Sequence, residues 1–120
     1  MKQKEDIKQS VLALAQGAFD KKGKDIEIID LEGISMLGDY FMIVSANNIK
    51  QSQSIADEIE DVAAEQGMTV LHREGYREGD WILLDFGDII CHIFGGDDTR
   101  EFYGLEALWS DASRVPFEGE

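Results

Sequence analysis

The run YFMIVSA, residues 40–46, is almost entirely apolar and contains β-branched and aromatic residues. A strand with this pattern is covered on both faces, so we expect it near the centre of a sheet. Apolar side chains between residues 55 and 63 then fall on one helical stripe, and Gly67 ends that pattern. A strand, a helix of about 15 residues and a further strand predict a right-handed crossover between parallel strands.

The segments on either side supply further elements. Apolar residues at helical spacing predict a helix that starts near Ile7 and ends near residue 22. A glycine-containing turn is expected between the last two strands, where Gly87-Asp88 predicts a tight hairpin. The remaining strands are expected at residues 25–31, 68–74, 81–86 and 89–94. A last helix is predicted over residues 97–109, with Phe102, Leu105 and Trp109 on its inner face.

These elements predict an α+β (α/β) fold with one domain. We expect a mixed five-stranded β-sheet flanked by helices over residues 1–112. Residues 113–120 contain the single proline and show little periodicity, so they are expected to form a loosely ordered tail.

Composition excludes several classes of function. The chain of 120 residues carries a net charge of −14, so its surface repels nucleic-acid backbones and anionic membranes. No apolar run approaches the roughly 20 residues needed to span a bilayer, and no targeting segment is recognisable. The single cysteine, Cys91, cannot form an internal disulfide. We therefore expect a cytoplasmic protein that contacts neither a membrane nor nucleic acid directly.

The sequence offers two catalytic possibilities. Cys91 and His92 are adjacent on a predicted strand, so their side chains point to opposite faces and cannot form a nucleophile–base pair. Cys91 is expected to be a buried structural thiol, and His92 a sheet-face histidine that makes one or two hydrogen bonds. Nucleotidyl transfer would require paired carboxylates on a strand and a loop that holds a triphosphate, and neither is recognisable. No cofactor and no metal ion are expected.

The segment from Glu74 to Phe94 is richer in interaction chemistry. Strand alternation places Trp81, Leu83 and Asp85 on one face, whereas the direction of Phe86 at the following turn is not determined. Aromatic residues beside acidic ones on a rigid hairpin match the composition of protein-binding surfaces. An alternative is that Trp81 only covers the sheet edge or packs under a helix.

Several motifs occur together in a recognisable order. They are GDYF at 38–41, the helical residues 53–59, EG at 74–75, GDW at 79–81, DFGD at 85–88, HIF at 92–94, REFY at 100–103, LE at 105–106 and LWSDA at 108–112. In these motifs the chain resembles the ribosomal silencing factors, also called Iojap-like proteins, from about residue 7 to residue 115.

The resemblance implies a binding protein that is not an enzyme. Members of that family bind the large ribosomal subunit through a basic protein, the universal large-subunit protein fourteen, on the face where the small subunit docks. They block subunit joining and lower translation, notably under nutrient limitation. Their fold is similar to that of nucleotidyltransferases but lacks the catalytic set.

The resemblance also indicates which residues meet the partner. Positions that match Trp81 and Phe86 belong to the contact surface of the family, and Gly87 and Asp88 shape the same patch. We expect Trp81 and Phe86 to form an apolar centre, surrounded by carboxylates that meet lysines or arginines. The full expected set is Asp39, Tyr40, Glu74, Trp81, Asp85, Phe86, Gly87 and Asp88.

Two other functions stay open at this point. One is a metal-dependent, nucleotidyltransferase-like enzyme. The other is a self-associating protein-binding module, in which the face of Trp81 pairs with its own copy in a homodimer.

Overall fold

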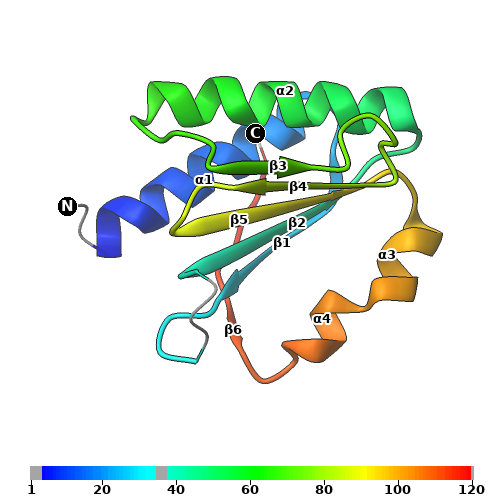
Figure 1. Cartoon of the computed structure of the whole chain (residues 1–120). Coiled ribbons are helices and arrows are strands. Elements are labelled where there is room, and N and C mark those ends of the chain that lie inside the picture. Colours follow the sequence, from blue (N-terminus) through cyan, green and yellow to red (C-terminus); the bar gives the residue numbers. More distant parts are fainter. Residues whose placement is uncertain (1–3, 35–37, 120) are drawn as a thin grey trace.

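The predicted central strand, β2 (Tyr40–Ser45), lies in the interior of a six-stranded sheet and is buried at every residue. The structure is a computed structural model that describes residues 4–34 and 38–119 (Figure 1). Its other elements are α1 (Lys4–Asp20), β1 (Lys24–Asp30), α2 (Ile49–Glu65), β3 (His72–Glu74), β4 (Trp81–Asp85), β5 (Ile89–Phe94), α3 (Asp97–Tyr103), α4 (Leu105–Leu108) and β6 (Ser113–Arg114). The burial of β2 confirms that it is covered on both faces.

The sheet is mixed, with the strand order β3-β4-β5-β2-β1-β6. β2 and β5 are parallel neighbours, and the other neighbouring pairs are antiparallel. β3 therefore runs in the same direction as β2, as the crossover required, although β4 and β5 lie between them. The predicted mixed sheet is confirmed, but it has six strands rather than five, because the C-terminal segment adds β6.

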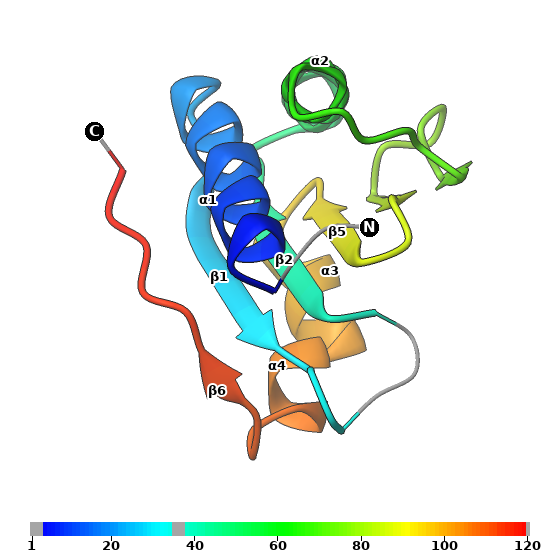
Figure 2. The same cartoon turned by 90° about the vertical axis from the view of Figure 1, so that its left-hand side faces the viewer.

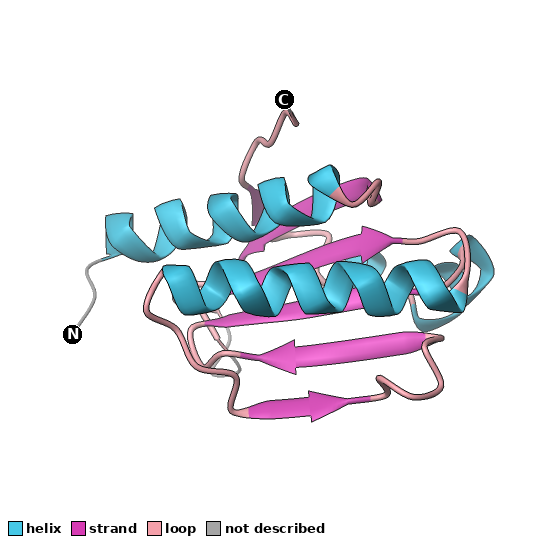
Figure 3. Ribbon diagram, turned by 90° about the horizontal axis from the view of Figure 1, so that it is seen from above, coloured by secondary structure: helices cyan, strands magenta, loops and turns pink. Residues whose placement is uncertain are grey.

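Helices cover both faces of the sheet. α1 and α2 lie side by side over one face (Figure 3), and α3 and α4 lie on the opposite face (Figure 2). The core under α1 and α2 includes the apolar α1 residues whose helical spacing predicted this helix, namely Ile7, Val11, Leu14, Ala15 and Ala18. A second, smaller core lies between the sheet and α3–α4. Among the residues that the structure describes, no helix combines the length and the apolar character needed to cross a lipid bilayer.

The predicted helix over residues 97–109 is wrong as a single element. Gly104 adopts a left-handed conformation with φ of 57°, and its N–H donates to the carbonyl oxygen of Arg100, so α3 ends there and α4 begins in a new direction. Leu105 and Trp109 pack against the second core as expected. Phe102 does not, because it lies before the break and is 82% exposed.

The C-terminal segment is attached to the sheet. Ser113 and Arg114 pair with β1, and the N–H of Val115 donates to the carbonyl oxygen of Ile28. The chain then runs along the outer side of β1 (Figure 2), where the ring of Phe117 contacts that of Phe19 edge to face. This docking is closer than the loosely ordered tail that the sequence predicted.

Candidate partner-binding surface

The face of β4 that is turned away from α1 and α2 carries Trp81, Leu83 and Asp85. Their partly buried side chains alternate with those of Ile82 and Leu84, which are completely buried. The strand register predicted from alternation is therefore confirmed. On β3, Glu74 lies opposite Leu83 and His72 lies opposite Asp85, so these side chains share the same face.

Trp81 is held in place by contacts with three other rings. Its indole Nε1–H donates a hydrogen bond to Nδ1 of His92, with 3.1 Å between the nitrogen atoms. Its ring stacks on that of Phe94, with 5.6 Å between centroids, and contacts that of Tyr103 at 4.2 Å. The indole is only partly buried, so it remains available at the surface in a fixed orientation.

Trp81, His92, Phe94 and Tyr103 form a ring cluster, and His92 is its buried polar member. It is 4% exposed, and burial lowers the pKa of its imidazole from 6.5 to about 4, so the ring is neutral at pH 7. Because Nδ1 accepts the hydrogen bond from Trp81, the proton resides on Nε2, which has no hydrogen-bond partner among the described residues. The predicted sheet-face histidine with one or two hydrogen bonds is confirmed.

Cys91 points to the other face of the sheet. It is completely buried in the core under α1 and α2, and this burial raises the pKa of its thiol. His92 instead contacts Phe41, which belongs to the second core. The expectation of a buried structural thiol that cannot pair with His92 is therefore confirmed.

Two predicted surface residues lie inside the protein. Phe86 is 7% exposed and Tyr40 is 1% exposed, and both belong to the core under α1 and α2. The expected apolar centre of Trp81 and Phe86 is therefore wrong, because these residues lie on opposite faces of the sheet. The physical reason is that the alternation of β4 continues one residue beyond the strand, which turns Phe86 inward together with Leu84.

Four of the remaining predicted residues, Asp39, Asp85, Gly87 and Asp88, gather at one end of the sheet, whereas Glu74 lies opposite Leu83. Gly87 and Asp88 form the tip of the β4–β5 hairpin, which closes through a hydrogen bond from the N–H of Phe86 to the carbonyl oxygen of Ile89. Gly87 has a φ of 91°, and its N–H donates to Oδ1 of Asp85 over 2.8 Å. The N–H of Asp39 donates to the carbonyl oxygen of Asp88. These contacts confirm the hairpin and bring three acidic residues together.

The acidic end and the ring cluster are separate parts of one surface. Trp81 and Asp85 are four residues apart on β4, which corresponds to about 13 Å along an extended strand. Leu83 lies between them and is partly buried. The surface therefore consists of the ring cluster at one end, Leu83 in the middle and the carboxylates of the hairpin at the other end.

Sequence reasoning did not identify Tyr103 as part of this surface. Its ring contacts both Trp81 and Phe94, although the three residues come from different elements. The available signal was Gly104, which could have indicated the end of α3 and hence the outward direction of the two preceding aromatic side chains.

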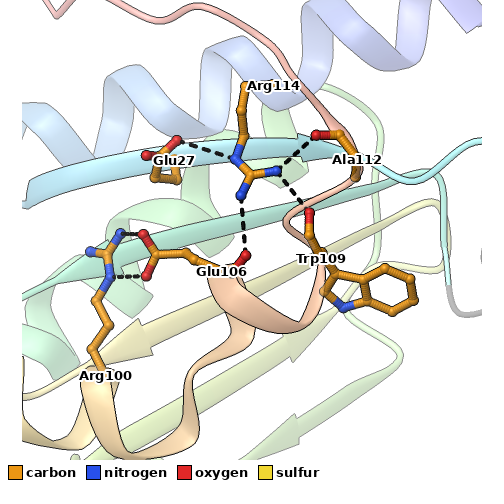
Figure 4. A network of polar contacts seen from close by, with 6 residues as sticks. All are labelled: Glu27, Arg100, Glu106, Trp109, Ala112 and Arg114. Carbon is orange, nitrogen blue, oxygen red and sulfur yellow. Dashed lines mark hydrogen bonds and ion pairs between the residues drawn. The ribbon is translucent and has the colours of Figure 1, made fainter.

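A network of polar contacts holds α3 and α4 in place (Figure 4). Tyr103 is the last residue of α3. Arg100 is 8% exposed and forms two hydrogen bonds with the carboxylate of Glu106, at 2.8 and 3.0 Å, and a third with Oγ of Ser45. The hydrogen bond from Arg100 lowers the pKa of Glu106. Arg114 donates to the carbonyl oxygens of Trp109 and Ala112, which ties the end of α4 to β6.

The described part of the chain contains no group of three or more histidine, cysteine, aspartate or glutamate side chains that could hold a metal ion. A hollow of about 540 Å³ lies between β1 and α3–α4, and five of the nine residues that line it are acidic. Arg100 is the basic residue in its lining, and the guanidinium of Arg100 donates hydrogen bonds to Glu106 and Ser45.

The sheet and its partly exposed ring cluster define a single-domain α+β protein with an acidic, aromatic surface. Residues 4–120 match the model of the family described as ribosomal silencing factor during starvation, RsfS. The chain belongs to this ribosomal silencing factor family, as the motifs had indicated.

Relatives and a solved structure agree with this assignment. The ribosomal silencing factor RsfS of Bacillus subtilis is 47% identical over 105 residues, which cover 87% of this chain and 88% of that protein. RsfS of Halalkalibacterium halodurans is 43% identical over 112 residues, which cover 92% and 95% of the two chains. A crystal structure from Bacillus halodurans superposes with a TM-score of 0.79 at 35% identity and covers 92% of this chain and 99% of that one.

Proposed function

We propose that this protein binds the large ribosomal subunit through the universal large-subunit protein fourteen and sterically blocks the joining of the small subunit. Translation then falls, in particular when nutrients are limiting. The single observation that carries this proposal is the match to the ribosomal silencing factor family over residues 4–120. The proposed mechanism makes and breaks no covalent bond, and it places the protein in the cytoplasm.

The proposed contact surface is the open face of β4. Trp81 is its apolar anchor, with Leu83 beside it, and the carboxylates of Asp39, Asp85 and Asp88 surround the hairpin end. Buried aromatic anchors slow dissociation, whereas carboxylates at the rim accelerate the approach of a basic protein in a salt-dependent way. Because the net charge is −14, the target must be a basic protein surface rather than exposed RNA.

Phe86 and Tyr40 take a different part in this proposal. Both side chains are buried, so they support the hairpin from beneath and do not touch a partner directly. Glu74 stays in the proposed contact set because its position opposite Leu83 places it on the same face as Trp81. Gly87 is retained because its positive φ shapes the tip of the hairpin.

The test is sedimentation of the protein with purified large subunits, followed by addition of small subunits. Trp81→Ala is expected to weaken large-subunit binding by about 2 kcal/mol or more, which is about thirtyfold in Kd. Ile49→Ala is the matched control, because it shortens a partly exposed apolar side chain at the start of α2, on the other face. Folding of both variants is checked by thermal melting.

Two results would contradict the proposal. One is an unchanged affinity of folded Trp81→Ala for the large subunit. The other is normal joining of the two subunits in the presence of a saturating excess of the wild-type protein.

A further inference from the structure

A hollow of about 430 Å³ lies beside the ring cluster, at the outer side of α3. It is lined by Asp80, Asp98, Thr99, Phe102 and Tyr103. The residues around this one space therefore supply two carboxylates and two aromatic rings.

The two carboxylates are not neutralised. Asp80 and Asp98 are both exposed, and neither forms an ion pair with any residue that the structure describes. The carbonyl oxygen of Asp80 accepts a hydrogen bond from the N–H of Gly95 over 2.9 Å, which fixes the loop before β4 against the turn that connects β5 to α3. The hollow therefore carries two negative charges on backbone segments that are held together.

The rings form a corner of the hollow. Phe102 and Tyr103 lie edge to face, with 5.2 Å between centroids and an interplanar angle of 88°. Phe102 is 82% exposed and Tyr103 is 47% exposed. Tyr103 in turn contacts Trp81, so the hollow is continuous with the proposed contact surface.

We propose that this hollow binds the side chain of an arginine on the basic protein partner. A guanidinium group forms charged hydrogen bonds with carboxylates and also stacks on aromatic rings, so it uses both kinds of wall. A lysine ammonium group would use the carboxylates but would not stack, and a phosphate would be repelled. This inference rests on the proposed function for the identity of the partner, and it adds a specific subsite to the contact surface.

The first test does not require ribosomes. N-acetyl-arginine amide is titrated into the full-length ¹⁵N-labelled protein, and the amide signals of residues 80 and 98–103 are followed by NMR. We expect saturable shifts at these signals in the millimolar range. N-acetyl-citrulline amide, which has the same shape without the charge, is expected to leave them unchanged.

Two double variants locate the binding. Asp80→Asn with Asp98→Asn is expected to abolish the shifts caused by the arginine derivative. The control, Asp61→Asn with Glu65→Gln, removes two exposed carboxylates from α2 on the other side of the sheet and is expected to preserve them. Absence of shifts in the wild-type protein, or equal shifts with citrulline, would overturn the proposal.

The second test measures binding to large subunits. Phe102→Leu is expected to weaken it about two- to fivefold, whereas Phe102→Tyr, which keeps the ring, is expected to preserve it. Loss of binding in Trp81→Ala together with unchanged binding in Phe102→Leu and in the Asp80/Asp98 variant would overturn this subsite and leave the proposed function standing. An arginine derivative that binds the hollow while wild-type protein fails to bind large subunits would support the subsite and overturn the proposed function.

Self-association is the remaining outcome. If the Asp80/Asp98 variant changes from dimer to monomer in sedimentation velocity but binds large subunits with unchanged affinity, a second copy of the chain fills the hollow, and the proposal is wrong.

Discussion

The indole Nε1–H of Trp81 donates to Nδ1 of His92 over 3.1 Å, and this hydrogen bond connects the exposed surface of the protein to a buried imidazole. The bond requires a neutral imidazole, because a protonated ring carries a hydrogen on both nitrogen atoms and has no acceptor for the indole. The orientation of Trp81 therefore depends on the protonation state of His92.

Acid is expected to destabilise the protein through His92. The pKa of the folded protein, about 4, lies below the ordinary 6.5, so the unfolded chain binds a proton that the folded chain does not. The stabilisation is complete above pH 6.5 and is lost as the pH falls toward 4, by up to about 3 kcal/mol. Urea unfolding of wild type and His92→Gln across this range isolates the effect, since the carboxylates of the two proteins titrate alike.

His72→Gln is the control for this experiment, because it removes an exposed imidazole from β3. It is expected to unfold with the pH dependence of the wild type. The interpretation fails if His92→Gln keeps that pH dependence, or if ¹⁵N NMR shows the imidazole of His92 to be protonated at pH 6.

Truncation of two phenylalanine residues, Phe86 and Phe102, is expected to change the free energy of unfolding by very different amounts. Phe86→Ala removes a ring that is 7% exposed and should lower the free energy of unfolding by about 3–5 kcal/mol. Phe102→Ala removes a ring that is 82% exposed and should change it by less than about 0.5 kcal/mol. Denaturant unfolding of both variants measures the difference. Equal losses would show that the buried position of Phe86 and the exposed position of Phe102 are assigned wrongly.

The burial of Phe86 and the exposure of Phe102 are two features that the sequence did not predict, whereas other features followed from local spacing. Periodicity identified the buried stripe of α1 and the alternation of Trp81, Leu83 and Asp85, because both depend only on local spacing. The direction of Phe86 was missed because it lies between a strand and a turn, where spacing gives no answer. The exposure of Phe102 was missed because Gly104 lies inside a helical pattern, where a glycine is tolerated, and was interpreted as part of one helix instead of as the end of α3.

Contacts between distant segments were also beyond sequence reasoning. Arg100 bonds to Ser45, and Tyr103 packs on Trp81, only because the sheet brings α3 beside β2 and β4. Neither residue of these pairs carries a local signal for the other. The two-residue strand β6 is too short to produce an alternating pattern.

The ion pairs of Arg100 and Arg73 are expected to differ in strength. Arg100→Ala removes the buried guanidinium of a partly buried ion pair with Glu106 and leaves Ser45 without its donor, so it should cost about 3 kcal/mol. Arg73 bonds to Glu60 over 2.6 Å, but its side chain is 46% exposed, and Arg73→Ala should cost about 1 kcal/mol or less.

Thermal or urea unfolding of both variants provides the comparison. Arg100→Lys is expected to recover little of the loss, because an ammonium group cannot form the paired hydrogen bonds with Glu106. A cost for Arg73→Ala as large as that for Arg100→Ala would refute the assignment of the Figure 4 network as the anchor of α3 and α4.

Gly75 and Gly67 offer a last matched comparison, since their φ angles are 78° and 79°. An alanine at either position pays the same cost for a left-handed conformation, about 1–2 kcal/mol. A methyl group at Gly67 meets no atom within 4 Å, whereas one at Gly75 would overlap the carbonyl oxygen of Trp81. Gly75→Ala should therefore destabilise the protein by about 1–3 kcal/mol more than Gly67→Ala in urea unfolding. Because the overlap acts on the backbone of Trp81, only Gly75→Ala should also shift the NMR signal of the indole N–H, and equal effects of the two substitutions would show that the loop before β4 does not position that ring.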